Sequence, residues 1–428
     1  MEKLKNEIEV SMKMIQEKAG KDGKVIVLVS GGVDSMVTAA LLLKALPAEN
    51  VYAIHVDNGF MRKDESKLVG EMLHKFGFKN LSIINAQDEF LNEQIEINGE
   101  LAPPLRKVTD PESKRKIIGS MFIEIVKKAA DKFNLDYDKT FIAQGTLRPD
   151  LLESGNPEVS DKMVKTHHND VDIVRRAREL GMIIETNWNW YKEDVRQVAR
   201  ILGIDEQIAS RQPFPGPGLA VRIICANEIN EINEDKKNKF EEFLKDKNIS
   251  GLIAPILSVG VQGNSRSYKN LAVLYGDPDF NKIAQIVKAI PDNLDFINRC
   301  AYVLNKQSID KLVCHKLEMS AKSAELARGI DYIITSEINR YLKENGGKIT
   351  QYFGVLIPVN TGGNKKYSAV IRAFLTTDFM TGKPAVPGED IPVSIIRSIS
   401  ERIKAKLHEI DLVLYDMTEK PPATMEWE

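Results

Sequence analysis

Hydrophobic and polar residues follow two alternating patterns along the first half of the chain. Short apolar runs of strand length occupy residues 24–30, 51–59, 80–86 and 139–146. Segments of helical length and periodicity lie between or after them, at residues 36–46, 63–77, 114–133 and 192–203. Strands that alternate with helices in this way predict a doubly wound α/β domain, with a parallel sheet covered by helices on both faces.

The first 20 residues have the pattern of an amphipathic helix and contain no long apolar region of the signal-peptide type. No stretch of the sequence approaches the roughly 20 apolar residues of a membrane span. The three cysteines, Cys225, Cys300 and Cys314, form no CxxC pair, which argues against a disulfide framework or a thiolate zinc site. These features predict a cytoplasmic protein without a membrane partner.

Composition excludes some further classes of function. The 428 residues are 43% hydrophobic and 28% charged, and the net charge is −2, so no large basic surface for nucleic acid is expected. The length allows two or three domains.

A stiff segment rich in proline and glycine, "RQPFPGPGLAVRI" at residues 211–223, interrupts the alternating pattern. It predicts a domain boundary, with one domain at residues 1–212 and a smaller α+β domain at residues 213–428. The second domain contains a faint repeat, in which Tyr268 matches Tyr367 and Asp279 matches Asp378. Two copies, at about residues 223–285 and 340–428, indicate an internal duplication; chance similarity between two β-hairpins is the alternative.

A possible phosphate site lies between the first strand and the first helix of the α/β domain, in Ser30-Gly31-Gly32-Val33-Asp34-Ser35. The first N–H groups of a helix are unpaired and favour an anion, and glycines allow the anion to approach the backbone. The P-loop pattern GxxxxGK[ST] is absent, and this loop has no lysine to reach the phosphates. Asp34 would repel the anion unless a cation such as Mg²⁺ lay between them.

The loop resembles the signature of the N-type ATP pyrophosphatases, which cleave ATP between the α- and β-phosphates and adenylate a substrate. Further stretches resemble the GMP synthase family: "VDNGFMR", "KRKIIG", "AQGT" with "RPD", "K-HHN", "PFPGPGLAVR", "DFMTG" and the final "KPPATMEWE". They occur in the order found in that family, between residue 30 and residue 428. The stretch "TTDFMTGKPAVPG" and the internal repeat favour the longer, eukaryotic-like type of synthetase region.

The resemblance implies amination of xanthosine 5′-monophosphate (XMP) to GMP through an adenyl-XMP intermediate, with ATP and Mg²⁺ required and AMP and pyrophosphate released. It implies that ATP contacts Ser30 to Ser35, Val56, Asp57 and Gly145, and that Asp34 and Asp150 bind the metal. The implied catalytic residues are Asp34, Lys116, Lys165, His167 and His168. The alternatives without a catalytic role are a solvent-exposed helix face for the KRK motif and polar residues of a surface loop for the histidine pair.

The XMP contacts implied by the resemblance are Arg222, Asn264, Lys366, Lys420 and Glu426. Relatives have an acidic residue at the position of Asn264 and usually Gln at that of Lys366, so these two contacts are the departures from the pattern. Trp188 and Trp190 replace a Glu-Pro-Leu segment of the relatives, and packing in the core is the default interpretation of both.

Only 29 residues precede Ser30, and none of the three cysteines lies on a glycine-flanked elbow. We therefore expect no glutaminase activity in this chain, and ammonia that is either free or supplied by a separate glutaminase subunit. A duplicated second domain could pair with itself and leave a monomer; a homodimer is the alternative. Two other functions stay open, a tRNA-modifying ATP pyrophosphatase and a non-catalytic nucleotide-sensing scaffold.

Overall fold

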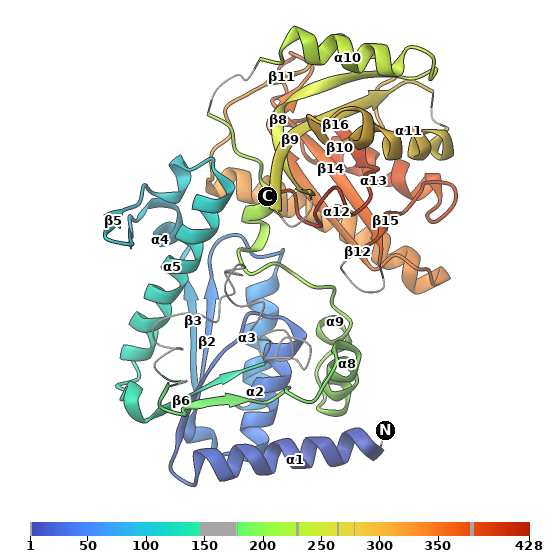
Figure 1. Cartoon of the computed structure of the whole chain (residues 1–428). Coiled ribbons are helices and arrows are strands. Elements are labelled where there is room, and N and C mark those ends of the chain that lie inside the picture. Colours follow the sequence, from blue (N-terminus) through green and yellow to red (C-terminus); the bar gives the residue numbers. More distant parts are fainter. Residues whose placement is uncertain are drawn as a thin grey trace. The chain divides into compact units, whose positions relative to one another are not determined.

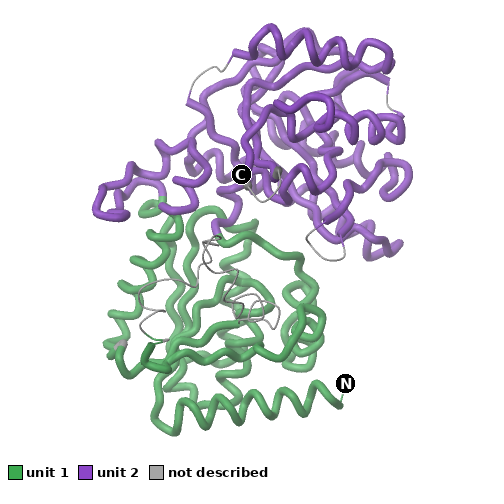
Figure 2. The backbone as a smooth tube through the Cα atoms, viewed as in Figure 1, with its two compact units in different colours: residues 1–90, 118–216 green, residues 91–117, 217–428 purple. Residues whose placement is uncertain are grey.

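The structure is a computed structural model that describes residues 2–145, 177, 179–227, 231–262, 265–277, 279–376 and 381–428. The chain forms two compact units (Figure 2). The first unit contains residues 1–90 and 118–216, and the second contains residues 91–117 and 217–428. The second unit spans more residues than the first, partly because it includes residues 91–117, which the sequence pattern places in the first domain.

The first unit is built on a parallel sheet with the strand order β3-β2-β1-β6-β7. Its strands are β1 (Lys24–Leu28), β2 (Val51–Asp57), β3 (Asn80–Asn85), β6 (Thr140–Gln144) and β7 (Ile183–Glu185). The chain proceeds from β1 outward to β3 and then returns to the other side of β1 with β6. The strand order therefore reverses between β1 and β6, and loops at the carboxyl ends of these two strands are where ligands bind in such sheets.

One large hydrophobic core joins the sheet to the helices α1 (Glu2–Ala19), α2 (Val33–Ala45), α3 (Glu65–Phe76), α8 (Lys192–Ile201) and α9 (Glu206–Ala209). Figure 1 shows α2 and α3 to the right of β2 and β3 and the long helix α5 (Pro111–Asp131) to their left. Short elements complete the connections: η1 (Ala48–Asn50), α4 (Gln87–Asn92) and η3 (Tyr137–Lys139). The predicted doubly wound parallel fold is confirmed.

The second unit contains a mixed sheet with the order β12-β14-β16-β10-β9-β8. Its strands are β8 (Ser250–Gln262), β9 (Ser265–Tyr275), β10 (Ile297–Val303), β12 (Gln351–Ile357), β14 (Tyr367–Leu375) and β16 (Ile410–Asp416). The helices are α10 (Glu234–Leu244), α11 (Phe280–Asn293), α12 (Ala321–Asn345) and α13 (Val393–Lys406). The remaining elements are short: β4 (Glu96–Ile97), β5 (Glu100–Leu101), η2 (Leu105–Lys107), η4 (Gly218–Arg222), β11 (Val313–Cys314), β13 (Val359–Asn360) and β15 (Lys383–Pro384).

The two halves of this sheet share one order of elements. In each half a helix precedes an antiparallel strand pair, and a second helix leads to a third strand that runs parallel to its neighbour: α10-β8-β9-α11-β10 and α12-β12-β14-α13-β16. The halves meet where β10 and β16 pair antiparallel. Tyr268 lies in β9 and Tyr367 begins β14, so these matched residues lie on corresponding strands. The first half extends to Val303, further than the predicted copy at about residues 223–285.

In the described part of the chain, no helix combines the length and the apolar character that crossing a membrane requires.

Candidate functional site

The loop that the sequence singles out joins β1 to α2 at the point where the strand order of the first unit reverses. Gly31 has a φ of +87°, and a Cβ there would lie 2.9 Å from Val69 Cγ2, so glycine is required on both counts. Gly32 is the N-cap residue of α2 and has no side chain to accept a hydrogen bond from the first turn. The first N–H groups of this 13-residue helix are therefore available to an anion.

Ser30 and Ser35 lie on either side of the two glycines. Their hydroxyl groups are 3.3 Å apart, and Ser35 Oγ donates to Gly32 O at 2.9 Å. The backbone N–H of Gly32 approaches Ser30 Oγ at 3.4 Å. These weak local bonds hold the loop in shape, and both hydroxyls can exchange them for hydrogen bonds to a phosphate oxygen.

Asp34 lies in the first turn of α2, and its two carboxylate oxygens have different surroundings. Oδ2 forms an ion pair with Lys192 Nζ. Oδ1 is buried and has no hydrogen-bond partner among the described residues. A buried carboxylate oxygen without a partner is costly unless a cation or a donor completes it, so Asp34 fits a role as a ligand of Mg²⁺.

Asp34 would be a metal ligand with few protein companions. No group of three or more His, Cys, Asp or Glu side chains that could hold a metal ion occurs in the described residues. Mg²⁺ is commonly held by one or two carboxylates together with substrate phosphates, so a single aspartate beside a phosphate loop suits this ion. The second predicted ligand, Asp150, lies outside the described residues.

Lys192 is a functional candidate that the sequence pattern did not reveal. It is the first residue of α8 and lies 158 residues after Asp34 in the chain. Both side chains of the pair are partly accessible, with 30% of Lys192 and 29% of Asp34 exposed. The loop that lacks a lysine of its own thus receives an ammonium group from α8. The only signal in the sequence is a lysine at the start of a late helix.

A buried network fixes the first turn of α2 against the neighbouring strands. Thr38 Oγ1 bonds to Asp34 O and to Thr186 Oγ1, at 3.0 and 2.8 Å. Asn187 Nδ2 donates to Asp34 O at 3.1 Å. A Cβ on Gly145 would lie within 2.9 to 3.1 Å of these same atoms. The structure therefore brings Gly145, which follows β6, close to the first turn of α2, and its contact with ATP stays a prediction.

Arg211 braces the loop from the other side. Its Nη1 donates to Gly31 O at 3.0 Å, and its Nη2 lies 2.6 Å from Glu65 Oε1. Glu65 is buried, and its second oxygen accepts from the N–H of Arg62 at 2.9 Å. Arg211 belongs to the proline- and glycine-rich segment, so one function of that segment is to hold the phosphate loop.

Val56 and Asp57 end β2, the strand next to β1. The side chain of Val56 is buried, and Asp57 Oδ1 accepts the N–H of Gly59 at 2.9 Å. Both residues therefore lie at the same edge of the sheet as the phosphate loop, and Asp57 stabilises its own turn. Their backbone is the part most suited to contact a nucleotide.

Three of the predicted catalytic residues and one predicted XMP contact belong to segments that the structure does not describe. Lys165, His167 and His168 lie outside the described residues, as does Asn264 of the second unit. Their roles stay predictions.

The three cations of the KRK motif, residues 114–116 of the second unit, differ in burial. Lys116, the predicted catalytic residue, is exposed on α5. Lys114 is buried instead, where its Nζ lies 2.6 Å from Glu428 Oε2 and donates to Ile223 O at 2.9 Å. Burial acts to lower the pKa of Lys114, but Glu428 outweighs it and the pKa is raised. Lys114 therefore anchors the final residue of the chain.

Arg222 and Glu426 are brought into direct contact in the second unit. Arg222 Nε and Nη2 donate to the two oxygens of Glu426, each at 2.9 Å, and Nη1 donates to Asp331 Oδ1 at 3.1 Å. The guanidinium carbon also lies 4.0 Å from the ring centre of Phe353. Burial acts to lower the pKa of Arg222, but Glu426 and Asp331 outweigh it and raise the pKa. Arg222 thus stays charged within a buried ion-pair group.

The other two predicted XMP residues lie at opposite ends of one strand. Lys366 is exposed and directly precedes β14, whose first residue pairs with Ile410. Lys420 lies beyond the other end of β14, where its backbone exchanges two hydrogen bonds of 3.0 Å with Gly382. Since β14 has nine residues, about 3.3 Å each, the backbones of the two lysines are separated by about the length of this strand.

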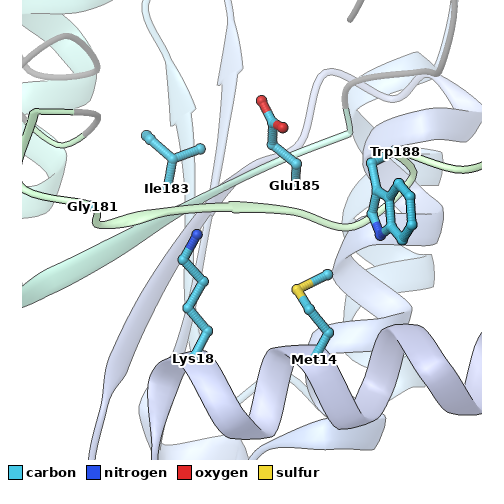
Figure 3. Close-up of a pocket in the computed structure, with 6 residues that line it drawn as sticks. All are labelled: Met14, Lys18, Gly181, Ile183, Glu185 and Trp188. Carbon is cyan, nitrogen blue, oxygen red and sulfur yellow. The ribbon is translucent and has the colours of Figure 1, made fainter.

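Core packing is the expected role of both Trp188 and Trp190, and the structure supports it for Trp190 but contradicts it for Trp188. Trp190 is buried and donates from Nε1 to Glu7 Oε2 at 3.0 Å, so core packing is its role. Trp188 is 42% exposed and lines a hollow of ≈ 380 Å³ with Met14, Lys18, Gly181, Ile183 and Glu185. Figure 3 shows Met14 and Lys18 rising from α1 towards the strand that carries Ile183 and Glu185. The residues that line this hollow include none of the predicted site residues.

Comparison with known proteins gives matches in both units. Residues 4–102 match the family described as NAD synthase, and residues 339–427 match the family described as GMP synthase C terminal domain. The GMP synthase [glutamine-hydrolyzing] of Dictyostelium discoideum is 35% identical over 94% of this chain and 62% of its own length. A probable GMP synthase [glutamine-hydrolyzing] of Leptospira interrogans is 34% identical over 97% of this chain and 66% of its own length.

The chain thus spans somewhat less than two thirds of the length of these curated relatives. Among solved structures, the NH3-dependent NAD synthetase of Campylobacter jejuni is 15% identical, with a TM-score of 0.34, and the match covers 57% of this chain and 85% of that one.

Proposed function

Because the chain belongs to the GMP synthase family and holds its ATP-pyrophosphatase region, we propose that it aminates XMP to GMP with ATP as the activating substrate. The O2 atom of XMP attacks the α-phosphorus of ATP, and the bond from that phosphorus to pyrophosphate breaks. Ammonia then forms a bond to C2, and AMP leaves with the former O2 atom. The products are GMP, AMP and pyrophosphate, with protons from ammonia released to solvent.

One observation carries this proposal: Asp34 Oδ1 is buried without a partner among the described residues, at the start of a helix whose first N–H groups face the switch point of the sheet. Such a site suits a metal-bound polyphosphate. Mg²⁺ at Asp34 would neutralise charge on the departing pyrophosphate.

In this proposal, different residues contact the two parts of ATP that separate when the bond between the α- and β-phosphates breaks. Ser30, Ser35 and the N–H groups after Gly32 hold the pyrophosphate portion of ATP, and Lys192 donates a charge-assisted hydrogen bond to it. Val56, Asp57 and Gly145 line the remainder of the nucleotide. Lys116, Lys165, His167 and His168 are proposed to act from outside this loop, where positive charge stabilises the α-phosphate as pyrophosphate leaves, and Asp150 is the second proposed metal ligand.

Residues of the second unit bind XMP in this proposal. The ammonium of Lys420 suits the 5′-phosphate, and the carboxylate of Glu426 suits ribose hydroxyls or N–H groups of the base. Arg222, Asn264 and Lys366 complete the set implied by the family resemblance, although Lys366 is separated from Lys420 by the length of β14.

The chain needs ammonia, which we propose is either free or delivered by a separate glutaminase subunit. The proposed setting is the cytoplasm, without nucleic acid or membrane partners. The antiparallel pairing of β10 with β16 gives the second unit a dimer-like centre within one chain, which supports a monomer over a homodimer.

The test is release of pyrophosphate from ATP and Mg²⁺ by the purified chain, with XMP and either ammonium or glutamine. The proposal expects release and GMP formation with ammonium and neither with glutamine. Asp34→Asn, which keeps the shape of the side chain, should abolish release and leave the free energy of unfolding within about 1 kcal/mol of the original. Release that needs no XMP would instead favour another acceptor, such as tRNA. Binding of XMP without any release would favour a nucleotide-sensing scaffold.

A further inference from the structure

The C-terminal tail, residues 420–428, is part of the packed second unit and carries two proposed XMP residues, Lys420 and Glu426. It lies along the outer edge of β8, where the N–H of Val259 donates to Trp427 O at 3.0 Å and that of Val261 donates to Pro422 O at 2.7 Å. Trp427 is fully buried. The backbone of the tail is therefore fixed by hydrogen bonds before any ligand binds.

Two buried arginines reinforce this attachment. Arg299 Nη2 donates to Thr424 O at 2.8 Å and to Glu426 O at 2.6 Å, and Arg372 Nη2 donates to Thr424 O at 3.1 Å. Both arginines pair with one carboxylate, Asp416, which also accepts from Trp427 Nε1 at 3.0 Å. All three charged side chains are fully buried. The carbonyl of Glu426 is therefore held in one place, and only its side chain needs further orientation.

Arg222 supplies that orientation. Its two parallel hydrogen bonds to Glu426 have the fork geometry that fixes a carboxylate in one plane. Asp331, only 2% exposed, accepts a hydrogen bond from a third nitrogen of the guanidinium, Nη1. The ring of Phe353 covers one face of the guanidinium.

Arg222 and Glu426 differ in how far their side chains are exposed to solvent. The side chain of Arg222 is 2% exposed, whereas that of Glu426 is 24% exposed. A ligand that reaches this group therefore meets the carboxylate and not the guanidinium. A phosphate could reach Arg222 only after displacing Glu426, at the cost of breaking two charge-assisted hydrogen bonds in a buried place.

We propose that Arg222 is a positioning residue that holds the Glu426 carboxylate towards the donors of a purine ribonucleoside, and that it does not bind the 5′-phosphate. The ribose hydroxyls and the N–H groups of the base are the donors that a carboxylate recognises. This inference rests on the proposed function in one respect, that XMP is the ligand.

The test compares XMP with xanthosine, which lacks the phosphate, by isothermal titration calorimetry on the full chain. The variants are Arg222→Lys, Glu426→Gln and the double variant. Arg222→Lys should raise the Kd of both ligands by the same factor, about 10- to 100-fold, because a lysine cannot bind both carboxylate oxygens of Glu426 in one plane. The double variant should bind no more weakly than Glu426→Gln alone, because Arg222 acts only through Glu426.

Two controls accompany these variants. Arg340→Lys changes an exposed arginine of α12 that pairs with Glu337, and it should leave both affinities unchanged. Hydrogen exchange at residues 423–427 should be the same in Arg222→Lys as in the original chain, because Arg299 and Arg372 still hold the backbone. If Arg222→Lys does not fold, Asp331→Asn serves in its place, since Asp331 touches Arg222 and is itself only 2% exposed.

The inference is overturned if Arg222→Lys, or Asp331→Asn in its place, weakens the binding of XMP and leaves the affinity for xanthosine unchanged. It is also overturned if the losses of Arg222→Lys and Glu426→Gln multiply in the double variant. A wild-type chain that binds neither ligand would contradict the proposed function as well. That outcome differs from the one in which the wild-type chain binds XMP but the affinity losses of the two single variants multiply.

Discussion

Replacing Lys192 by Met should weaken pyrophosphate binding much more than it weakens the fold. The substitution keeps an unbranched side chain of similar length and removes only the ammonium that pairs with Asp34 Oδ2. Because about 30% of each side chain is exposed, solvent screens the pair, and its loss should cost about 0.5–1 kcal/mol of unfolding free energy.

The effect on binding should be larger, because pyrophosphate would lose a charge-assisted hydrogen bond. Such a bond contributes about 1.5–3 kcal/mol, which corresponds to a dissociation constant roughly 10- to 150-fold higher. The assay is calorimetric titration of inorganic pyrophosphate with Mg²⁺, and urea unfolding measures stability separately.

The matched control is Lys75→Met. Lys75 pairs with Asp205 at 3.3 Å in the same unit, but both side chains are largely exposed, at 60% and 59%, and neither belongs to the phosphate loop. This control should change neither pyrophosphate affinity nor stability by a measurable amount. An unchanged pyrophosphate affinity in Lys192→Met, with the control also unchanged, would refute the assignment of Lys192 to the phosphate site.

Three further outcomes test other parts of the molecule. Gly145→Ala should raise the Kd for ATP and lower the unfolding free energy by about 1–3 kcal/mol, because the new Cβ would lie 2.9 Å from Thr38 Oγ1 and 3.0 Å from Asp34 O. Calorimetry would measure the Kd and urea unfolding the stability. An unaltered ATP affinity would place Gly145 outside the site. Lys114→Met should destabilise the second unit by about 3–5 kcal/mol, because Glu428 would be left as a buried carboxylate without its partner; the double variant Lys114→Met with Glu428→Gln should recover part of this loss in urea unfolding, and no recovery would show that the pair is not the cause. Burial raises the pKa of the Cys314 thiol from 9.0 to about 11, so the unfolded thiol ionises first as pH rises. The contribution of this thiol to the free energy of unfolding is fully present below pH 9 and falls by up to about 2–3 kcal/mol towards pH 11. Cys314→Ala should therefore make the urea midpoint less sensitive to pH over that range than in the original chain. An equal sensitivity would exclude Cys314 as a contributor.

The sequence alone predicts the parallel α/β fold well, since buried strands and amphipathic helices differ clearly in the period of their apolar residues. The strand β7 escaped this reasoning because three residues, Ile183–Glu185, are too short to show any period. The phosphate loop could be predicted because its features are local: two glycines, two serines and an aspartate at a strand-to-helix junction.

Contacts between distant segments could not be predicted in the same way. Lys192 joins Asp34 only because β1 and the start of α8 lie at one edge of the sheet, and nothing near residue 192 in the sequence indicates a phosphate. The KRK motif shows the same limit, because which of its three cations is buried depends on the position of Glu428, more than 300 residues away. Arg222 was predicted as a residue of the XMP site, but its partners Glu426 and Asp331 become evident only once the chain is folded.

The path of an oxygen atom tests the central claim most directly. XMP carrying ¹⁸O at C2 is incubated with the chain, ATP, Mg²⁺ and ammonium, and the products are analysed by mass spectrometry. The account predicts one ¹⁸O atom in AMP for each GMP formed, because the O2 atom that attacks the α-phosphate leaves with it. AMP without the label would mean that a different oxygen attacks ATP, and it would contradict the adenyl-XMP route on which the assignment of both units depends.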